Sequence, residues 1–356
     1  MGRKEPVIAT YLDHAASAPM LPAAHAAIQA GLALDANPSS PHGAGRKARA
    51  ALEDARARVA AALDWPGEVL FTSGASEALF IALARSHAPR RIVSAVEHEA
   101  VMRHATGAAR VAVDSGGLIA PDTLPDPADA LFAIQHVNNE TGVIQPLDTI
   151  GAHVRAGGGV LLVDCAQSAG KMPLPDCDMA AISAHKFGGP PGIGALLVRD
   201  LSLIAPTGGQ ERGYRGGTEN VAGAMAMAAA LETGRDWLDG ALALRARLEN
   251  AIIDAGGEVI AAASPRIATI GSYRAPGVAS AVQLIKLDGA GVAVSAGSAC
   301  SSGSMRASAV LTAMGMAPET AGEAIRVSIG PDTRAADIDR FLEVWAPMLA
   351  KSGARA

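Results

Sequence analysis

The chain has 356 residues, of which 49% are hydrophobic and 18% are charged, and these proportions exclude a disordered protein. The formal net charge is −5 and only 3% of the residues are aromatic, which argues against a nucleic-acid-binding surface. No segment reaches the ~20 consecutive apolar residues of a membrane helix, no signal peptide is expected, and three cysteines fit a reducing compartment. We therefore expect a cytoplasmic protein that binds neither nucleic acid nor membrane.

Strand and helix patterns alternate through the first two thirds of the chain. Short apolar runs predict strands at 69–72, 91–94, 108–113, 130–136, 160–164, 179–183 and 195–198. Helices are predicted at 22–34, 46–63, 75–86 and 147–155, with a further helix after 97–99. Such alternation predicts an α/β protein with a mostly parallel sheet that is covered by helices on both faces.

The pattern changes after Gly234. A long helix is predicted at 237–255, followed by strands near 258–260, 266–270 and 278, another helix, a strand at 324–329 and a helix at 335–349. We therefore predict two domains. The larger covers residues 12–234, and the smaller combines residues 1–11 with residues 235–356.

A lysine stands between a strand-like apolar run and a turn that cannot be helical, in the segment Ile-Ser-Ala-His-Lys-Phe-Gly-Gly-Pro. Lys186 is by default a solvated loop residue. On a rigid turn it can instead be partly desolvated, with its amine available as a nucleophile toward a carbonyl.

An acid ends one of the predicted buried strands. Asp164 follows the apolar residues 160–163, and ligands of open α/β sheets bind beyond the carboxyl ends of the strands. A carboxylate placed there can pair with the protonated ring nitrogen of pyridoxal phosphate (PLP). A turn or N-capping role is the alternative for this residue taken alone.

A glycine turn between a predicted strand and a predicted helix offers an anion site. The sequence Ser73-Gly74-Ala75-Ser76 opens the helix with exposed amides and a hydroxyl, which suit a phosphate group. Simple N-capping is the alternative. The phosphate interpretation depends on Ser183 and His185, which stand beside Lys186 and supply further partners.

Two polar residues follow other predicted strands. Asn139 lies in an Asn-Asn-Glu-Thr-Gly segment that is either a turn or a source of a donor to a ring hydroxyl. His98 is either a helix cap or a catalytic residue.

The last third of the chain holds two further candidates. Cys300 lies in a Gly-, Ser- and Ala-rich stretch that predicts an exposed, reactive thiol, whereas Cys165 and Cys177 are expected to be buried and inert. Arg326 lies within an apolar strand and needs an anionic partner, either a substrate carboxylate or an internal salt bridge.

These motifs together resemble those of the cysteine desulfurases, which are PLP enzymes of the class V aminotransferase group. The matching segments, in order from about residue 11 to residue 330, are YLDHAASAP, NPSSPHGAG, FTSGASE, EHEAV, HVNNETG, VDCAQS, SAHKFGGPPGIGAL, RGGTEN, SAGSACSSGS and IRVSIG. The resemblance implies the aspartate-aminotransferase-like fold, PLP-dependent transferase fold type I, with a large domain around a mostly parallel sheet and a smaller α+β domain.

The resemblance also implies roles for the candidate residues. Lys186 carries PLP and moves the α-proton, Asp164 keeps the ring nitrogen protonated, and His98 stacks on the ring and acts as an acid–base. Gln167 and Asn139 hydrogen-bond near the phenolic oxygen of the ring. The phosphate is held by the amide of Ala75, by Ser76, Ser183 and His185, and by Thr218 of a second subunit, which implies a homodimer. Arg326, assisted by Asn37, binds the substrate carboxylate.

The implied reaction removes sulfur from L-cysteine. Cys300 attacks the sulfur, alanine is released, and the Cys300 persulfide passes its sulfur to an acceptor such as an iron–sulfur scaffold or a tRNA-thiolation protein. The spacing from Cys300 to Arg326 resembles that of the iron–sulfur-cluster branch, in which Cys300 can also be a transient iron–sulfur ligand. A selenocysteine lyase or an aminotransferase, which has less use for Cys300, and a non-catalytic binding protein are the alternatives.

Overall fold

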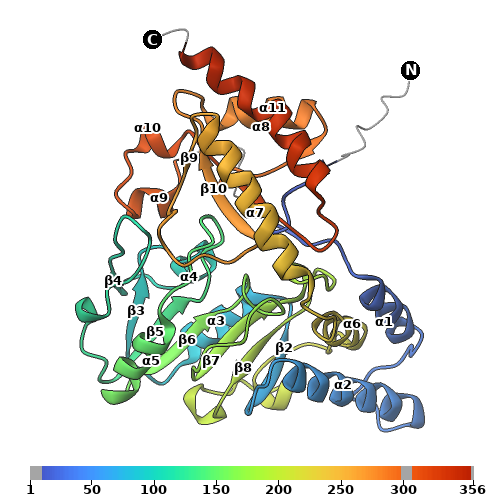
Figure 1. Cartoon of the computed structure of the whole chain (residues 1–356). Helices are drawn as coiled ribbons and strands as arrows, with labels where there is room; N and C mark the ends of the chain where they lie inside the picture. The colour runs from blue at the N-terminus through green and yellow to red at the C-terminus, as the bar shows by residue number, and fades with distance from the viewer. Residues whose placement is uncertain (1–9, 298–306, 354–356) are drawn as a thin grey trace.

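The computed structural model describes residues 10–297 and 307–353, which include a central seven-stranded sheet (Figure 1). Its strand order is β2-β8-β7-β6-β5-β3-β4. The strands are β2 (Glu68–Thr72), β3 (Arg90–Ser94), β4 (Ala109–Val111), β5 (Ala130–Gln135), β6 (Val160–Asp164), β7 (Met179–Ser183) and β8 (Gly194–Val198). Strands β4, β3, β5, β6 and β7 are parallel to one another, whereas β8 runs antiparallel to both β7 and β2. The prediction of a mostly parallel sheet is confirmed.

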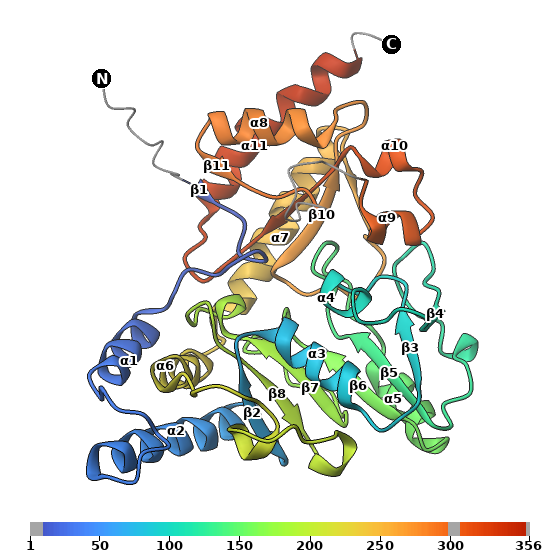
Figure 2. The same ribbon diagram turned by 180° about the vertical axis from the view of Figure 1, so that it is seen from behind.

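Helices cover both faces of this sheet, as Figures 1 and 2 show from opposite sides. One face packs against α3 (Ala75–Arg85) and α4 (Glu99–Met102). The other packs against α2 (Gly43–Ala62), α5 (Leu147–Ala156) and α6 (Val221–Leu231), and α1 (Pro22–Leu32) lies on α6. Strands β5 to β8 are buried on both faces, which explains why they read as unbroken apolar runs.

Helix α6 was not among the predicted helices. Its sequence, VAGAMAMAAAL, has no polar side and therefore no helical periodicity. The structure explains this composition, because nine of its residues are buried between the sheet, α1 and α2. Its start is marked by Asn220, whose side-chain oxygen accepts a hydrogen bond from the backbone N–H of Gly223 at 2.9 Å.

The remaining helices and strands pack against one another in a second region, which lies above the central sheet in Figure 1. Strands β9 (Glu258–Val259), β10 (Ile270–Arg274) and β12 (Ala324–Ser328) form an antiparallel sheet, and β1 (Thr10–Tyr11) pairs with β11 (Val292–Ala293). The helices are α7 (Trp237–Asp254), α8 (Ser280–Gly289), α9 (Ala309–Ala313), α10 (Pro318–Ala321) and α11 (Ala335–Gly353). Tyr273, Phe341 and Trp345 fill the core of this part.

Four short 3₁₀ turns complete the assignment of the described residues: η1 (Pro121–Thr123), η2 (Ala184–Lys186), η3 (Leu201–Leu203) and η4 (Glu211–Gly213). No helix in residues 10–297 and 307–353 is long and apolar enough to cross a membrane. The division of the chain into domains near residue 234 stays a prediction.

Two strand predictions were wrong. The strand placed at 266–270 begins only at Ile270 and continues to Arg274, and no strand forms at Val278. The alternation of apolar and polar residues continues past Ile270, so the sequence pattern did not determine at which residue this strand begins. Arg266 forms instead an ion pair with Glu249 of α7, and Val278 lies in the turn before α8.

Candidate active site

A cavity of about 390 Å³ lies at the carboxyl ends of β5, β6 and β7 and beside the N-terminus of α3. This is the position at which open α/β sheets bind their ligands. Nine residues that the sequence singled out line it together: Ala75, Ser76, His98, Asn139, Asp164, Gln167, Ser183, His185 and Lys186. They come from segments more than 100 residues apart, which only the parallel arrangement of the strands brings to one edge.

Lys186 lies on a tight turn that a glycine makes possible. It ends η2 directly after β7, and Gly188 follows with a φ of +87°, in the region that favours glycine. The Lys186 Nζ donates hydrogen bonds to the backbone oxygens of Ala15 at 2.7 Å and Ala16 at 3.0 Å. The amine is therefore held at the wall of the cavity by the N-terminal segment.

Asp164 ends β6 with a buried carboxylate. Burial raises the pKa of Asp164, while the N–H of Ala166, which donates to its Oδ1 at 2.9 Å, and the charges of His98 and Lys186 lower it. A cationic N–H in the cavity would offset the cost of this burial. Asp164 thus fits a protonated ring nitrogen.

Gln167 supplies a second observation that fits a bound ring. Its amide nitrogen donates to the backbone oxygen of Ala15 at 2.9 Å. The amide oxygen is buried and accepts no hydrogen bond from the described part of the chain. A ligand hydroxyl in the cavity would satisfy this acceptor.

His98 combines the two interpretations that the sequence left open. Its Nδ1 accepts a hydrogen bond from the N–H of Ala100 at 3.1 Å and so caps α4. The neutral ring therefore carries its proton on Nε2. The ring also lines the cavity, where this N–H or the ring face can meet a ligand.

The N-terminus of α3 forms one end of the cavity. Gly74 precedes the helix with φ +157° and ψ 177°, and the amide of Ala75 and the hydroxyl of Ser76 follow in its first turn. Ser183, at the end of β7, and His185 stand opposite. Burial, with the charges of Lys186 and Lys171, lowers the pKa of His185 to about 4, so this ring is neutral at pH 7. These groups fit a phosphate.

Sequence reasoning missed two buried polar residues at this edge. Gln135 ends β5 in register with Asp164 and lines the cavity. Glu97 accepts a hydrogen bond from the N–H of Gln135 at 2.8 Å, and its other oxygen has no partner in the described residues. A polar residue at the end of the apolar run 130–134 was the available signal for Gln135. Glu97 was visible only as a neighbour of His98.

Arg326 forms an internal salt bridge, which was one of the two roles that the sequence left open for it. Its Nη2 lies 2.7 Å from Oδ1 of Asp13, and its Nη1 donates to the backbone oxygen of Asn139 at 2.9 Å. The second oxygen of Asp13 accepts a hydrogen bond from Ser295 at 2.9 Å. Arg326 is therefore adjacent to a cavity residue, Asn139, but is not itself among the residues that line the cavity.

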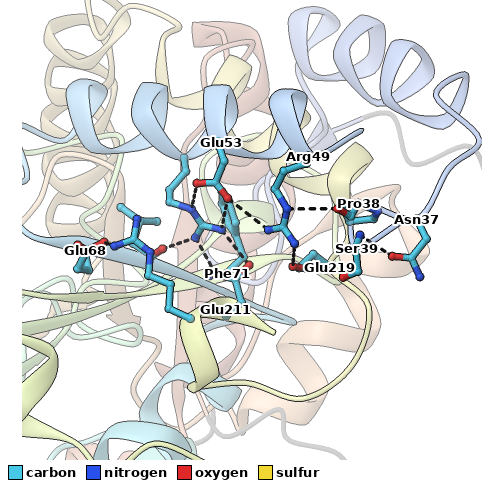
Figure 3. A network of polar contacts seen from close by, with 12 residues as sticks. Asn37, Pro38, Ser39, Arg49, Glu53, Glu68, Phe71, Glu211 and Glu219 are labelled. Carbon is cyan, nitrogen blue, oxygen red and sulfur yellow. Dashed lines mark hydrogen bonds and ion pairs between the residues drawn. The ribbon is translucent and has the colours of Figure 1, made fainter. Parts of the chain in front are cut away.

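Asn37 and Thr218 lie outside the cavity of their own chain. Both are exposed, and the Asn37 side chain accepts a hydrogen bond from the N–H of Ser39 at 2.8 Å. Arg49 of α2 connects their two segments, because it donates to the backbone oxygen of Pro38 and forms an ion pair with Glu219 at 3.1 Å (Figure 3). The two segments therefore share one anchor.

Cys300 lies outside the described residues, and so does its suggested role as an iron–sulfur ligand. The ends of the segment that contains it approach a single buried carboxyl group, that of Glu140. Ser308 donates to Glu140 at 2.5 Å, and any Cβ at Gly297 would collide with the same side chain. Within the described ranges, no group of three His, Cys, Asp or Glu side chains forms a metal site.

The other two cysteines lie in the core, as expected. Cys165 and Cys177 are buried and form no disulfide. Burial raises the pKa of both thiols, which keeps them protonated and unreactive at neutral pH.

Comparison with known proteins identifies the family of the chain. The class-V aminotransferase profile matches residues 10–341. A cysteine desulfurase of Cereibacter sphaeroides is 35% identical over 95% of each chain, and an IscS-like cysteine desulfurase of Mycobacterium tuberculosis is 35% identical over 96% of each. The solved structure of a NifS-like protein superposes with a TM-score of 0.85 at 30% identity, and the match covers 96% of this chain and 99% of the other. The chain therefore belongs to the class V aminotransferase family and, within it, to the PLP-dependent cysteine desulfurases.

Proposed function

We propose that the chain removes sulfur from L-cysteine, releases L-alanine, and carries the sulfur as a persulfide of Cys300 to an acceptor. The observation that supports this proposal most is the cavity in which Lys186, Asp164 and the α3 N-terminus meet. An amine, a carboxylate and an anion site are the partners that the aldehyde, the ring nitrogen and the phosphate of PLP require. The substrate in this proposal, L-cysteine, comes from the similar proteins, which are named cysteine desulfurases.

The cofactor, when bound, supplies an electron sink that weakens bonds at the α-carbon of an amino acid. In our proposal, Lys186 binds its aldehyde and moves the α-proton. Asp164 pairs with the ring nitrogen, Asn139 and Gln167 contact the ring oxygen, and His98 covers the ring. Ser76, Ser183, His185 and the Ala75 amide hold the phosphate.

We infer that Arg326 binds the substrate carboxylate. Its guanidinium is buried and already held by Asp13, which fixes its direction, and its Nε has no hydrogen-bond partner in the described residues. A substrate carboxylate would compete with Asp13 or share the guanidinium with it. Asn37 is exposed and lies outside the cavity of its own chain. It could assist Arg326 only from a second subunit or after a movement of its loop.

The sulfur step uses the Cys300 thiolate as the nucleophile. The thiolate attacks the sulfur of the bound cysteine and forms a sulfur–sulfur bond, and the carbon–sulfur bond breaks. The electron pair of the broken bond returns to carbon, which is protonated and leaves as alanine. The persulfide then transfers its sulfur to a thiolate of the acceptor, by exchange at sulfur.

Substitution of Cys300 by Ser tests the sulfur step. We expect Cys300→Ser to keep its bound PLP, which visible absorbance measures, and to lose alanine formation from cysteine at least ~100-fold, because a hydroxyl cannot replace the thiolate. Cys177→Ala, which removes a buried thiol elsewhere, is the matched control and should retain turnover. Full turnover by Cys300→Ser would refute the persulfide step. Turnover that depends on an added 2-oxo acid would instead identify an aminotransferase.

We also propose that the active unit is a homodimer in which Thr218 of one subunit completes the phosphate site of the other. The exposure of Thr218, and its absence from the cavity of its own chain, support this arrangement. The acceptor is a protein of the iron–sulfur scaffold or tRNA-thiolation type, in the cytoplasm, to which Cys300 delivers sulfur. In such a transfer Cys300 would also be a transient iron–sulfur ligand.

Mixed dimers test the shared site. Co-expressed Lys186→Ala and Thr218→Asp chains, separated by different tags, should recover about half of the wild-type activity in the mixed dimer, since one of the two sites then has both native residues. Each variant alone should be nearly inactive. If Thr218 acts within its own chain, the mixed dimer stays inactive.

A further inference from the structure

A second cavity lies behind Lys186, on the side away from the proposed phosphate site. Its volume is about 70 Å³, and its walls come from the N-terminal segment, the turn after β6, the Lys186 turn, the loop after β12, and the segment from the end of α6 to the start of α7. Lys186 lines both this cavity and the larger one. Lys186 is therefore part of the wall between the larger cavity and this second cavity.

A second lysine lines this rear cavity. Lys171 lies on the same turn as Gln167, where its backbone N–H donates to the oxygen of Ser168 at 2.9 Å. Only 8% of the residue is exposed. In the part of the chain that the structure describes, burial and the positive charges of Lys186 and Arg326 act on the Lys171 ammonium, and no carboxylate is among these influences. An ammonium in such surroundings is costly, and none of the roles assigned above uses it.

The surroundings of Lys171 are mainly basic. His14, His185, Lys186 and Arg326 face it from the N-terminal segment, η2 and β12, and the acids of the same region are Asp13, Asp164 and Asp332. Asp13 is bound to Arg326, Asp164 faces the larger cavity, and Asp332 lies on the His14 side. Burial lowers the pKa of His14 to about 4, so that ring is neutral at pH 7. The charge that acts most on Lys171 is thus that of Lys186.

Like charges at short range disfavour each other. Burial and the charges of Lys186 and Arg326 lower the pKa of Lys171 to about 7. The coupling is reciprocal, because a proton on one amine makes a proton on the other less favourable. An amine next to another cationic group is one of the known ways to activate a lysine nucleophile.

We propose that Lys171 is a positioning residue of this enzyme, because its buried side chain places a second positive charge behind Lys186 and so favours the neutral form of the Lys186 amine. The proposal rests on the role of Lys186 proposed above. It assigns three functions to the eight residues from the end of β6 through the turn that follows: Asp164 at the ring nitrogen, Gln167 at the ring, and Lys171 behind the amine.

A titration of the holoenzyme without substrate tests this role. The pH midpoint at which the visible absorbance of the bound cofactor changes reports protonation at its link to Lys186. Removal of a neighbouring positive charge raises this midpoint. We therefore expect Lys171→Met to raise it by about one pH unit, whereas Lys171→Arg, which is charged at every pH of the titration, should leave it at or below the wild-type value. Lys47→Met removes an equal charge from the exposed surface of α2 and should leave the midpoint unchanged.

The outcomes separate this proposal from the proposed function. A wild-type midpoint in Lys171→Met with full cofactor content overturns the proposal, as does an equal shift in Lys171→Met and Lys171→Arg, which would show an effect of packing. If Lys171→Met fails to fold, Lys171→Gln replaces it, with the same expected rise. If Lys186→Ala keeps the pH-dependent absorbance, the role of Lys186 fails instead, independently of any cysteine turnover.

Discussion

Two buried carboxyl groups at the carboxyl ends of the strands differ in their tasks. Asp164 lines the cavity and has a ligand nitrogen as its proposed partner. Glu97 stands beside it, accepts the N–H of Gln135, and does not line the cavity. Burial, together with the charge of Asp164, raises the pKa of Glu97 to about 8. Glu97 is therefore protonated at neutral pH and leaves the negative charge to Asp164.

This difference predicts a pH effect on stability. The pKa of Glu97 is higher in the folded than in the unfolded chain, so its favourable contribution is complete below the unfolded pKa and is lost as pH rises toward about 8. Glu97→Gln cannot ionise and removes this loss. We expect the unfolding temperature of wild type to fall more between pH 5.5 and pH 8.5 than that of Glu97→Gln, by a difference equivalent to several kcal/mol. Glu99→Gln, at an exposed neighbouring position, is the control. Parallel pH curves of wild type and Glu97→Gln would contradict the assignment.

At the scale of elements, the sequence predicted the strands that carry the site well. Strands β6 and β7 begin and end at the predicted residues, because both are continuous apolar runs closed by a polar residue. Their carboxyl ends also carry Asp164 and Ser183, so the general position of the cavity followed from the fold class. The helix α6 was missed, because a helix buried on all sides lacks the polar face on which periodicity depends.

The pairing of strands over long distances was beyond the sequence pattern. Nothing in residues 68–72 indicates that β2 pairs with β8 and runs antiparallel to it. Likewise, the pattern at Arg326 could not decide between a substrate and Asp13, because Asp13 is 313 residues away in the chain. Contacts of this kind depend on tertiary structure and leave no local trace.

A buried ion pair connects three elements and carries a prediction of its own. Arg56 of α2 lies 2.7 Å from Glu211 of η4, both side chains are nearly inaccessible, and Glu211 also accepts the N–H of Phe71 in β2 at 2.9 Å (Figure 3). Glu211→Ala leaves the Arg56 charge buried without this partner. We expect it to lower the free energy of unfolding by about 3–5 kcal/mol, measured by urea denaturation.

An exposed ion pair of the same helix provides the comparison. Arg58 and Glu232 lie 2.6 Å apart, but their side chains are 35% and 43% exposed. Glu232→Ala should cost less than about 1 kcal/mol, since solvent screens the pair. Equal losses in Glu211→Ala and Glu232→Ala would show that burial does not govern the strength of these pairs.

At the scale of the whole molecule, most of the predicted site residues lie together and a few lie elsewhere. Nine of the predicted residues share one cavity, whereas Asn37 and Thr218 stand outside it on segments that Arg49 connects. A sequence motif gives no information about which copy of a chain uses it. The resemblance implied a role for Thr218 in a second subunit, and the structure shows only that Thr218 lies outside the cavity of its own chain.

The order of strands in the central sheet has a consequence for the synthesis of the protein. Strand β2 is an edge strand whose partner, β8, begins more than 120 residues later in the chain. A nascent chain that has emerged only as far as the Lys186 turn has the parallel strands but lacks β8, which is the partner of β2 and the second strand beside this turn. Because the ribosome adds residues in order, the antiparallel pair of β7 and β8, which flank Lys186, is among the later parts of the large sheet to form. The turn that carries Lys186 is therefore completed only after β8 has joined the sheet between β7 and β2.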